Sequence, residues 1–510
     1  MSKPRAVHPF LFAIFPIVFL LSHNVEQVSY RDVLFPAMLV LGLTLLAFLS
    51  LSIILRNSNK AAFFVSISLL LFFSYGHVYD LIQGLQVAGH SIGRHPYLLL
   101  VWAEIFASGV YWLPRSRIGV HHVTKLLNIV SLCLVVFSLL NIGLYEIHAA
   151  KPAEGRPTTG TDPVEPSTPT DTERLPDIYY IILDGYASSQ TLNQVHGYDN
   201  RPFTDSLAER GFYVAHDSRS NYPQTFLSLA SSLNMEYVND LTDVVGEDSE
   251  DRAIPYRMIK DSSVLRFLRS RGYRSIHFSS GWGPTFRNHH ADLNIHCGGT
   301  NEFTVVLLRT TMIRPLERDF AWSLRERVLC TFSELATIPT IDGPKFVFAH
   351  ILSPHPPFLF GRDGEPVSNA SPLMTLGATW EQEDYLNQLM FVNTQVESLV
   401  DEILSESAIP PIIILQADHG PATSFRNTAG AGWHNPTDEM LRERTSILNA
   451  YHLPGVCSDL LYDSITPVNT FRLIFNCYFD TDHRLLDDEI YFCSYKEPYE
   501  MWAVTDTVTD

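Results

Sequence analysis

Residues 177–186, DIYYIILDGY, and residues 411–420, PIIILQADHG, share one pattern: an apolar run, then Asp, then Gly within two residues. The runs are dense in Ile, Leu and Tyr and lack polar alternation, which is typical of strands covered on both faces of a parallel sheet. Residues 273–279 and 345–352 are similar in composition. We therefore predict buried strands over 177–183, 273–279, 345–352 and 411–417.

Helical patterns separate these apolar runs. We predict helices over 202–210, over 262–271 with Asp261 as N-cap, and over about 380–406. Strands that alternate with helices predict an α/β doubly wound domain, here spanning residues 176–510. Ligands of such sheets bind beyond the carboxyl ends of the strands.

Three of the predicted strands lead into side chains that can bind a metal ion, namely Asp184, then His350 and His355, then Asp418 and His419. Asp184 alone is typical of a turn, and His350 fits an ordinary strand residue. Because the carboxyl ends of parallel strands meet at one edge of the sheet, the set as a whole predicts an ion-binding site there.

Thr225 lies within residues 220–234, SNYPQTFLSLASSLN, directly before a helix-like apolar run. One interpretation makes Thr225 a simple N-cap, a position that Thr favours. The other places its hydroxyl where helix N–H groups and the helix dipole stabilise an anion. As a nucleophile it would need activation by a metal ion.

Residues 1–147 are predicted to form a transmembrane domain of about five helices. Several of the apolar runs approach the ~20 residues that cross a bilayer; the runs cover 9–28, 33–55, 61–82, 98–114 and 124–147. Lys and Arg concentrate in the loops on one side, which places the N-terminus in the cytoplasm. We therefore expect a multi-pass protein of the cell (inner) membrane with its large domain on the exterior, periplasmic side. A signal peptide is the alternative for the first run, but no small-x-small cleavage site follows it.

Two acidic residues, Asp80 and Glu104, lie within or near the ends of these apolar runs. Charge inside a bilayer is costly and is by default a functional hypothesis. The simpler interpretation places Asp80 at the interface and pairs Glu104 inside the bundle.

Composition separates the two halves of the chain. Residues 1–150 hold nine Lys and Arg against five Asp and Glu, although the whole chain has a net charge of −19. The acidic remainder has no electrostatic means of binding phosphate backbones, so we exclude nucleic acid as a partner. Residues 148–175, rich in Pro, Thr and Glu, are predicted to be a linker. Five of the six cysteines follow residue 176, and their pairing cannot be read from spacing.

These motifs, in this order, resemble the alkaline-phosphatase/sulfatase superfamily: Asp184 after a strand, Thr225 before SLASSL, a His-x-x-x-x-His-x-Pro segment, and ADHG. The membrane helices, linker and exterior domain resemble its membrane-anchored branch of lipoteichoic-acid synthases and phosphoethanolamine transferases. The resemblance implies a sulfatase-like catalytic domain over 176–510.

The resemblance also implies roles for individual residues. It makes Asp184, Thr225, Asp418 and His419 the ligands of one divalent ion, Mn²⁺, Mg²⁺ or Zn²⁺. It makes Thr225 the nucleophile as well, and His355 a substrate-positioning catalytic residue. His350 and His434 are possible further ligands or substrate contacts. The chain lacks the Cys/Ser-x-Pro-x-Arg box of sulfatases, because Thr225 is followed by Phe-Leu-Ser-Leu with no arginine.

The implied function is transfer of a phosphate-linked headgroup through a covalent phospho-threonine at the outer membrane face. The partners would be a membrane phospholipid donor and a glycan or lipid acceptor. Two alternatives stay open: a phosphoesterase or phosphodiesterase that uses the same site with water as acceptor, and a non-catalytic binding module. The donor headgroup and the oligomeric state cannot be inferred.

The Lys and Arg asymmetry predicts that a reporter fused after residue 160 is active only outside the cytoplasm. An even number of membrane spans would reverse this result. Cytoplasmic activity of the reporter would therefore contradict the five-span topology and remove the argument for an exterior substrate.

Overall fold

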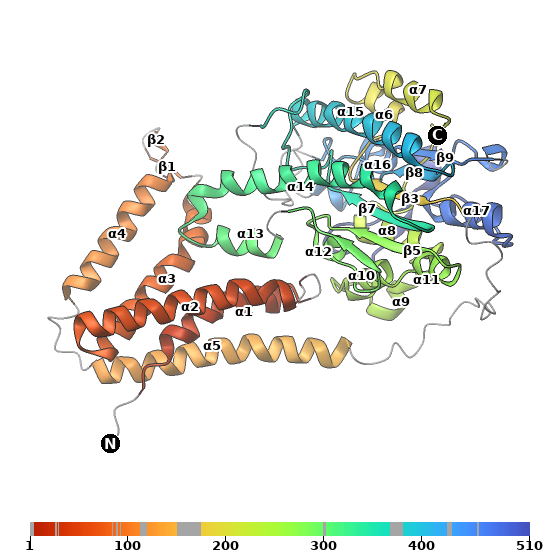
Figure 1. Ribbon diagram of the computed structural model, residues 1–510. Helices are drawn as coiled ribbons and strands as arrows, with labels where there is room; N and C mark the ends of the chain where they lie inside the picture. Colours follow the sequence, from red (N-terminus) through yellow and green to blue (C-terminus); the bar gives the residue numbers. More distant parts are fainter. Residues whose placement is uncertain are drawn as a thin grey trace. The chain divides into compact units, whose positions relative to one another are not determined.

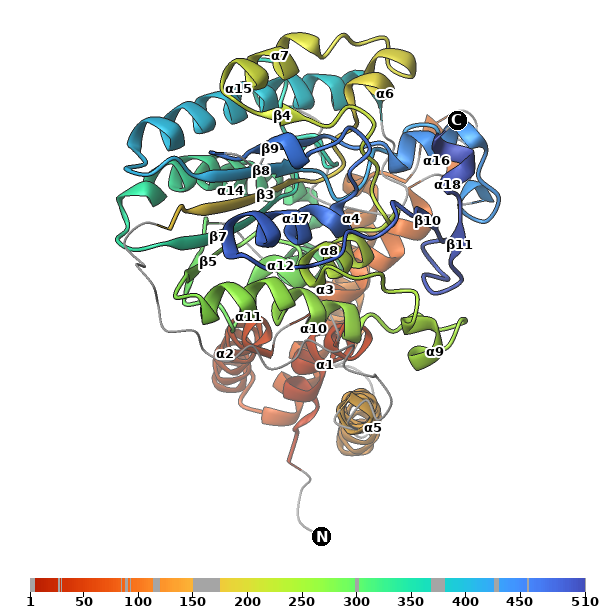
Figure 2. The same ribbon diagram turned by 90° about the vertical axis from the view of Figure 1, so that its right-hand side faces the viewer.

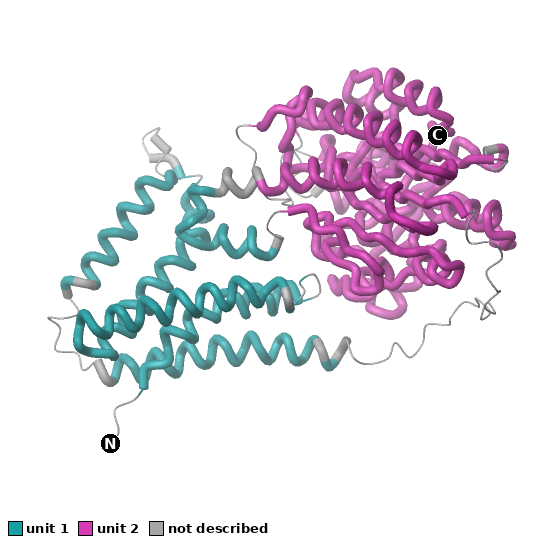
Figure 3. The backbone as a smooth tube through the Cα atoms, viewed as in Figure 1, with its two compact units in different colours: residues 1–152, 301–320 teal, residues 153–300, 321–510 magenta. Residues whose placement is uncertain are grey.

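The computed structural model describes residues 5–25, 28, 30–83, 85–87, 90–91, 93–112, 120–149, 175–298, 302–367, 381–425, 431–455 and 458–509. These residues belong to two compact units (Figures 1 and 3). The first comprises residues 1–152 and 301–320, and the second comprises residues 153–300 and 321–510. Most of the predicted linker, 150–174, lies outside the described residues.

Helices occupy each of the five apolar runs of the first unit. They are α1 (His8–His23), α2 (Tyr30–Leu55), α3 (Ser58–Ile82), α4 (His95–Trp112) and α5 (Val120–Ala149), with the short strands β1 (Gln86–Val87) and β2 (His90–Ser91) before α4. Among the described residues, three stretches are long and apolar enough to cross a membrane, Asp32–Leu55, Ser58–Ile82 and His122–Tyr145. Helix α1 is apolar but shorter, with 16 residues and an internal Pro16. The five-span topology thus stays a prediction.

A segment distant in sequence completes the first unit. Helix α13 (Glu302–Arg309) places Phe303 and Leu307 in an apolar cluster with side chains of α1, α2 and α3, namely Ile17, Leu21, Val33 and Phe73. Beyond α13, the backbone N–H of Gly76 donates to the carbonyl of Thr310 at 2.9 Å. The apolar pattern gave no indication that residues 301–320 would join the helices of the N-terminal half.

An ion pair fixes the same segment to α3. Arg314, whose side chain is 2% exposed, lies 2.6 Å from a carboxylate oxygen of Asp80 and donates to the carbonyl of Gly76 at 2.9 Å. The predicted cost of an acidic residue at this position is therefore offset by a cation from residues 301–320. Glu104, which the simpler interpretation paired inside the bundle, is exposed instead.

The second unit is built on a seven-stranded sheet in the order β4-β9-β8-β3-β7-β5-β6. Its strands are β3 (Ile178–Leu183), β4 (Tyr213–Val214), β5 (Arg274–Phe278), β6 (Leu293–Ile295), β7 (Lys345–Ile351), β8 (Ile412–Gln416) and β9 (Asn449–His452). All four predicted strands are present, and β3 is central, parallel to both β7 and β8. The prediction of an α/β sheet domain is confirmed, although the sheet is mixed, because β9 runs antiparallel to both of its neighbours, β8 and β4.

Helices cover both faces of the sheet (Figure 2). Alternate residues of β3 enter two separate apolar cores, with Tyr179, Ile181 and Leu183 in one core and Ile178, Tyr180 and Ile182 in the other. The first core is closed by α7 (Arg201–Glu209), α14 (Glu317–Thr337) and α15 (Gln382–Glu406), and the second by α8 (Thr225–Asn234), α10 (Ala253–Lys260), α11 (Ser263–Ser270) and α17 (Pro467–Phe479). Double burial explains why the strands lack polar alternation.

Smaller elements fill the connections: α6 (Ser189–Gln194), α9 (Leu241–Val245), α12 (Gly283–Phe286), α16 (Asp438–Thr445), α18 (Thr505–Thr509), β10 (Tyr491–Phe492) and β11 (Trp502–Ala503). One predicted cap is wrong. Ser262, rather than Asp261, is the N-cap of α11, because its hydroxyl accepts the backbone N–H of Leu265 at 3.3 Å.

A disulfide joins Cys297 to Cys330, which lie on either side of residues 301–320. Cys477 is also disulfide-bonded, whereas Cys493 is a buried free thiol. Disulfides persist in oxidising compartments and are rare in the cytosol. The bond is therefore consistent with an exterior position for the second unit.

Removal of the Cys297–Cys330 bond should destabilise the second unit. The bond spans 33 residues, and closing a loop of that size raises the free energy of the unfolded chain by about 3–4 kcal/mol at 25 °C, because it lowers the entropy of that chain. Thermal unfolding of the solubilised Cys297→Ala, Cys330→Ala double variant should show a clearly lower Tm than the wild type under non-reducing conditions. Equal Tm values would show that the bond does not constrain the unfolded chain.

Candidate functional site

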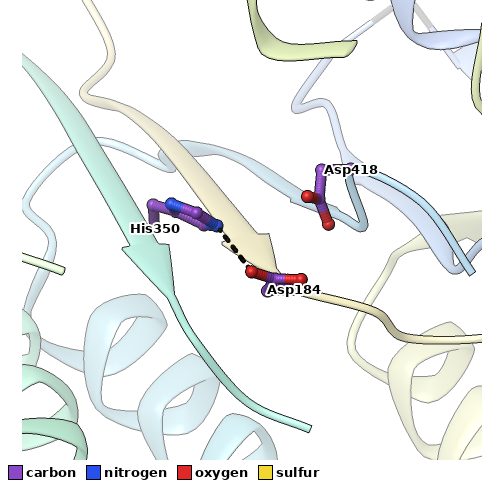
Figure 4. A group of neighbouring side chains, drawn as sticks. All are labelled: Asp184, His350 and Asp418. Atoms are coloured by element: carbon purple, nitrogen blue, oxygen red, sulfur yellow. Dashed lines mark ion pairs between the residues drawn. The ribbon is translucent and has the colours of Figure 1, made fainter. Parts of the chain in front are cut away.

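The register of the three central strands brings their ends together. Ile182 on β3 lies opposite His350 on β7 and opposite Gln416 on β8. Asp184 and Asp418 each follow their strand by one or two residues, so they reach the edge at which His350 lies. Figure 4 shows these three side chains directed toward a common space. All three are buried, and their ligand atoms lie within 4.8 Å of one another.

The turns after the strands bond to each other. Gly185 has a φ of 73°, a left-handed conformation that favours glycine, and its N–H donates to Oδ1 of Asp418 at 3.2 Å. The backbone N–H of His355 donates to the carbonyl of Asp184 at 2.9 Å. The carboxylate of Asp418 and the backbone of Asp184 are therefore held in place by neighbouring loops as well as by their own strands.

His419 lies close to each of the other three predicted ligands. Its Nε2 lies 3.1 Å from Oγ1 of Thr225, 3.3 Å from Oδ2 of Asp418 and 3.6 Å from Oδ1 of Asp184. Its Nδ1 lies 3.0 Å from the carbonyl oxygen of Gly420, which can only accept. The ring proton of neutral His419 therefore lies on Nδ1, and the lone pair of Nε2 faces the three oxygens.

Thr225 is the first residue of α8, not its N-cap. The N-cap is Gln224, and its side chain donates to the carbonyl of Ser494 at 2.7 Å rather than capping the helix. The simple N-cap interpretation of Thr225 is therefore wrong, because its hydroxyl is within hydrogen-bond distance of His419 instead. The helix start still favours an anion at this position.

The remaining predicted histidines differ in their placement. His350 lies 3.3 Å from Asp184 through Nε2 and 2.9 Å from Oγ1 of Thr285 through Nδ1. The ring of His355 lies 6.1 Å from that of His419. His434 is not brought to this group, because its side chain is 51% exposed and pairs with Glu497 at 3.3 Å. Thr285, which is buried, was missed from the sequence, where nothing distinguishes it from the other threonines.

Burial and charge shape the electrostatics of the site. Burial raises the pKa of Asp418 to about 7, and the nearby carboxylate of Asp184 adds to the effect. Burial also acts to raise the pKa of Asp184, but the imidazoles of His355, His350 and His419 outweigh it, and the net change is downward. Burial lowers the pKa of His419 well below its usual value. A neutral His419 beside a charged Asp184 is the state that a metal ion requires of its ligands.

The donor set fits a divalent cation. Asp184 Oδ1, Asp418 Oδ2 and His350 Nε2 are buried without a hydrogen-bond partner among the described residues. Ligands ~2.0–2.2 Å from a tetrahedral Zn²⁺ lie roughly 3.3–3.6 Å from each other, and the separations around His419 Nε2 are 3.1–3.6 Å. The strand ends thus form a candidate metal site of carboxylate, hydroxyl and imidazole groups.

Comparison with known protein families gives the same superfamily that the sequence motifs indicate. The family described as Sulfatase matches residues 176–444, which confirms the predicted superfamily and, with it, the prediction of a sulfatase-like enzyme. No curated protein sequence matches the chain.

Solved structures give more distant likenesses. The C-terminal periplasmic domain of EcEptC from Escherichia coli is 13% identical, with 66% of this chain and 94% of that chain covered and a TM-score of 0.43. The membrane protein lipooligosaccharide phosphoethanolamine transferase A from Neisseria meningitidis is 13% identical, with 88% and 89% covered and a TM-score of 0.36. The phosphonate monoester hydrolase of Agrobacterium radiobacter is 13% identical, with 62% and 80% covered and a TM-score of 0.41. These sequence identities and TM-scores are too low for the activity of any of these proteins to be assigned to this chain.

Asp418→Asn should lower divalent-metal affinity sharply and leave the fold assembled, because it removes a ligand charge but little volume. Isothermal titration of the metal-free protein with Zn²⁺ and with Mn²⁺ would measure the loss, and far-UV circular dichroism would check the fold. Wild-type affinity in this variant would show that Asp418 is only a turn residue.

Proposed function

Because the chain belongs to the sulfatase family, we propose that it moves a phosphate-linked headgroup at the outer membrane face, through a covalent phospho-threonine at Thr225. The observation that carries this proposal is the position of the Thr225 hydroxyl. It lies at the start of α8 and 3.1 Å from His419 Nε2, beside two buried carboxylates. Helix capping does not explain a hydroxyl at this point, because Gln224 is the N-cap.

In the proposed first step, Thr225 Oγ1 attacks the phosphorus of a donor phospholipid. The bond between phosphorus and the diacylglycerol oxygen breaks, and that oxygen leaves with the proton that the threonine hydroxyl loses. An acceptor hydroxyl on a glycan or lipid then displaces Thr225 and receives the headgroup phosphate. The backbone N–H groups at the start of α8 face the anion that both steps develop.

The ligands proposed for one divalent ion are Asp184, Thr225, Asp418 and His419, with His350 as a further imidazole. When bound, the ion would lower the pKa of the threonine hydroxyl and offset phosphate charge. Two imidazoles beside carboxylates suit Zn²⁺ or Mn²⁺ better than Mg²⁺.

His355 is proposed to position the substrate phosphate. Its Nδ1–H donates to the carbonyl of Pro356 at 2.6 Å, which orients the ring. Burial lowers the pKa of His355, and the charge of Asp184 opposes that change. A buried imidazole held in this way offers a fixed contact to an incoming phosphate oxygen.

The membrane helices favour a lipid donor, because an enzyme anchored in the bilayer meets its donor in the same plane. The Cys297–Cys330 disulfide supports an exterior catalytic domain. A hydrolase would use the same first step with water as the acceptor, and it remains the second candidate. A non-catalytic binding module is disfavoured, because Asp184, Asp418 and His419 are buried together and the Thr225 hydroxyl lies beside them.

Thr225→Ala should abolish headgroup release, because it removes the hydroxyl that is proposed to attack the phosphorus. Loss of a nucleophile costs on the order of 10⁶ in rate in a well-studied hydrolase. Thr225→Ser should keep part of the activity, because only a methyl group is lost. Release of a radiolabelled headgroup from vesicles measures the rate, and mass spectrometry of the trapped wild type should find phosphate on Thr225.

The controls separate the two candidate functions. Addition of glycan acceptors should raise product formation by a transferase and leave headgroup hydrolysis as a minor path. Near wild-type release by Thr225→Ala, at normal expression, would eliminate the covalent mechanism and favour attack by water.

A further inference from the structure

Arg444, in the last turn of α16, joins two loops of the candidate site. Its Nε donates to the carbonyl of Pro223 at 2.7 Å, and its Nη1 donates to the carbonyl of Gly420 at 2.8 Å. Pro223 precedes Thr225 by two residues, and Gly420 directly follows His419. A single guanidinium group therefore connects the loop that carries the nucleophile to the loop that carries its imidazole partner.

The preceding residue, Glu443, holds the continuation of the second loop. Its buried carboxylate accepts the backbone N–H groups of Thr423 at 3.1 Å and Ser424 at 2.9 Å. The hydroxyls of Thr423 and Ser424 donate to the same carboxylate. Nε2 of His196 lies 3.6 Å from Oε1 of Glu443. Four donors on one buried carboxylate fix residues 423–424 against α16.

Gly420 allows this close packing. Its N–H donates to the carbonyl of Arg444 at 2.8 Å, and a Cβ at this position would lie 2.1 Å from the carbonyl oxygen of Glu443. No larger residue fits without a backbone shift. The end of α16 and the turn after His419 thus form one rigid assembly.

We propose that Arg444, with Glu443 beside it, is a positioning residue that sets the separation between Thr225 Oγ1 and His419 Nε2. This inference rests on the proposed function of Thr225. The guanidinium is planar and rigid, so its two bonds fix the spacing of the carbonyls of Pro223 and Gly420. A lysine ammonium has no such fork, and it cannot hold both carbonyls in one geometry.

The charge of Arg444 contributes as well. The residue is only 6% exposed, and burial lowers its pKa to about 10, although the carboxylates of Asp418, Asp184 and Glu443 oppose the change. Arg444 thus stays charged at neutral pH. Its guanidinium carbon also lies 5.3 Å from the centre of the Trp433 ring, which contributes a further contact to the cation.

A second arginine provides a matched control. Arg472 on α17 also bridges two backbone carbonyls, through Nε to Met235 and Nη1 to Arg484, each at 2.7 Å. Met235 is the C-cap of α8, the helix end opposite Thr225. Arg472→Gln therefore removes an equivalent clamp without touching the loops of the site.

The experiment compares Arg444→Gln, Arg444→Lys and Arg472→Gln in the full-length protein. For each, kcat and KM are measured on a synthetic phosphodiester, and Zn²⁺ affinity and Tm are measured independently of turnover. Both Arg444 variants should lose about 100-fold in kcat, as expected for misplacement of a reacting group by about 1 Å, with KM changed less than 3-fold. Zn²⁺ affinity should fall at least 10-fold, because Thr225 and His419 are proposed ligands. Arg472→Gln should lower Tm and leave kcat and Zn²⁺ affinity near wild type.

Other results would overturn the inference. An Arg444→Lys variant with at least half of wild-type kcat would show that charge alone suffices. Equal losses in Arg444→Gln and Arg472→Gln would reduce Arg444 to a general structural role. If the wild type turns over no phosphodiester and forms no phospho-threonine, the proposed function fails. The Zn²⁺ affinity of the Arg444 variants is then the measurement that tests the positioning role of Arg444. Unchanged affinity in both Arg444 variants would refute it.

Discussion

The central physical constraint in this molecule is the burial of two carboxylates in one site. Asp184 and Asp418 are each 1% exposed and lie with His350 inside a space of 4.8 Å. Two like charges removed from water at this distance repel strongly, and each also loses its hydration. The protein must supply positive charge or donors from every side, or one carboxylate must bind a proton. The surrounding imidazoles and hydrogen-bond donors compensate part of this charge, and the ligand atoms of Asp184, His350 and Asp418 lie close enough together for one cation to contact all three.

The sheet brings the two carboxylates together, and groups from neighbouring loops and helices compensate their charge. Parallel pairing of β3 with β7 and β8 places the three strand ends at one edge, and the apolar cores on both faces prevent the strands from slipping. The start of α8 and the guanidinium of Arg444 then approach the carboxylates from two further elements. Both of these groups favour an anion, so the arrangement that stabilises the carboxylates also suits a phosphate ester.

The sequence predicts part of this site, for physical reasons that differ by residue. Asp184, Asp418 and His419 directly follow apolar runs, so strand order alone brings them together, and Thr225 is found because an apolar helix begins at it. His350 stayed ambiguous, because the sequence of a doubly buried strand does not reveal which face a residue occupies. Glu443 and Arg444 lie in the charged stretch DEMLRERT, which resembles a solvated helix. Only the fold turns the end of that helix toward the site.

Residues 301–320 illustrate a second limit on what the sequence predicts about the fold. Nine of these 20 residues are apolar, but nothing in their spacing indicates that Phe303 and Leu307 pack with α1, α2 and α3. Asp80 alone looks like an interfacial charge, because its partner Arg314 lies more than 200 positions away in the chain. The Cys297–Cys330 disulfide joins the part of the chain before residues 301–320 to the part after them. The catalytic unit is thus connected to the helical unit at residues 300–301 and 320–321 as well as through the region after residue 148, and the composition of the linker does not reveal these two further connections.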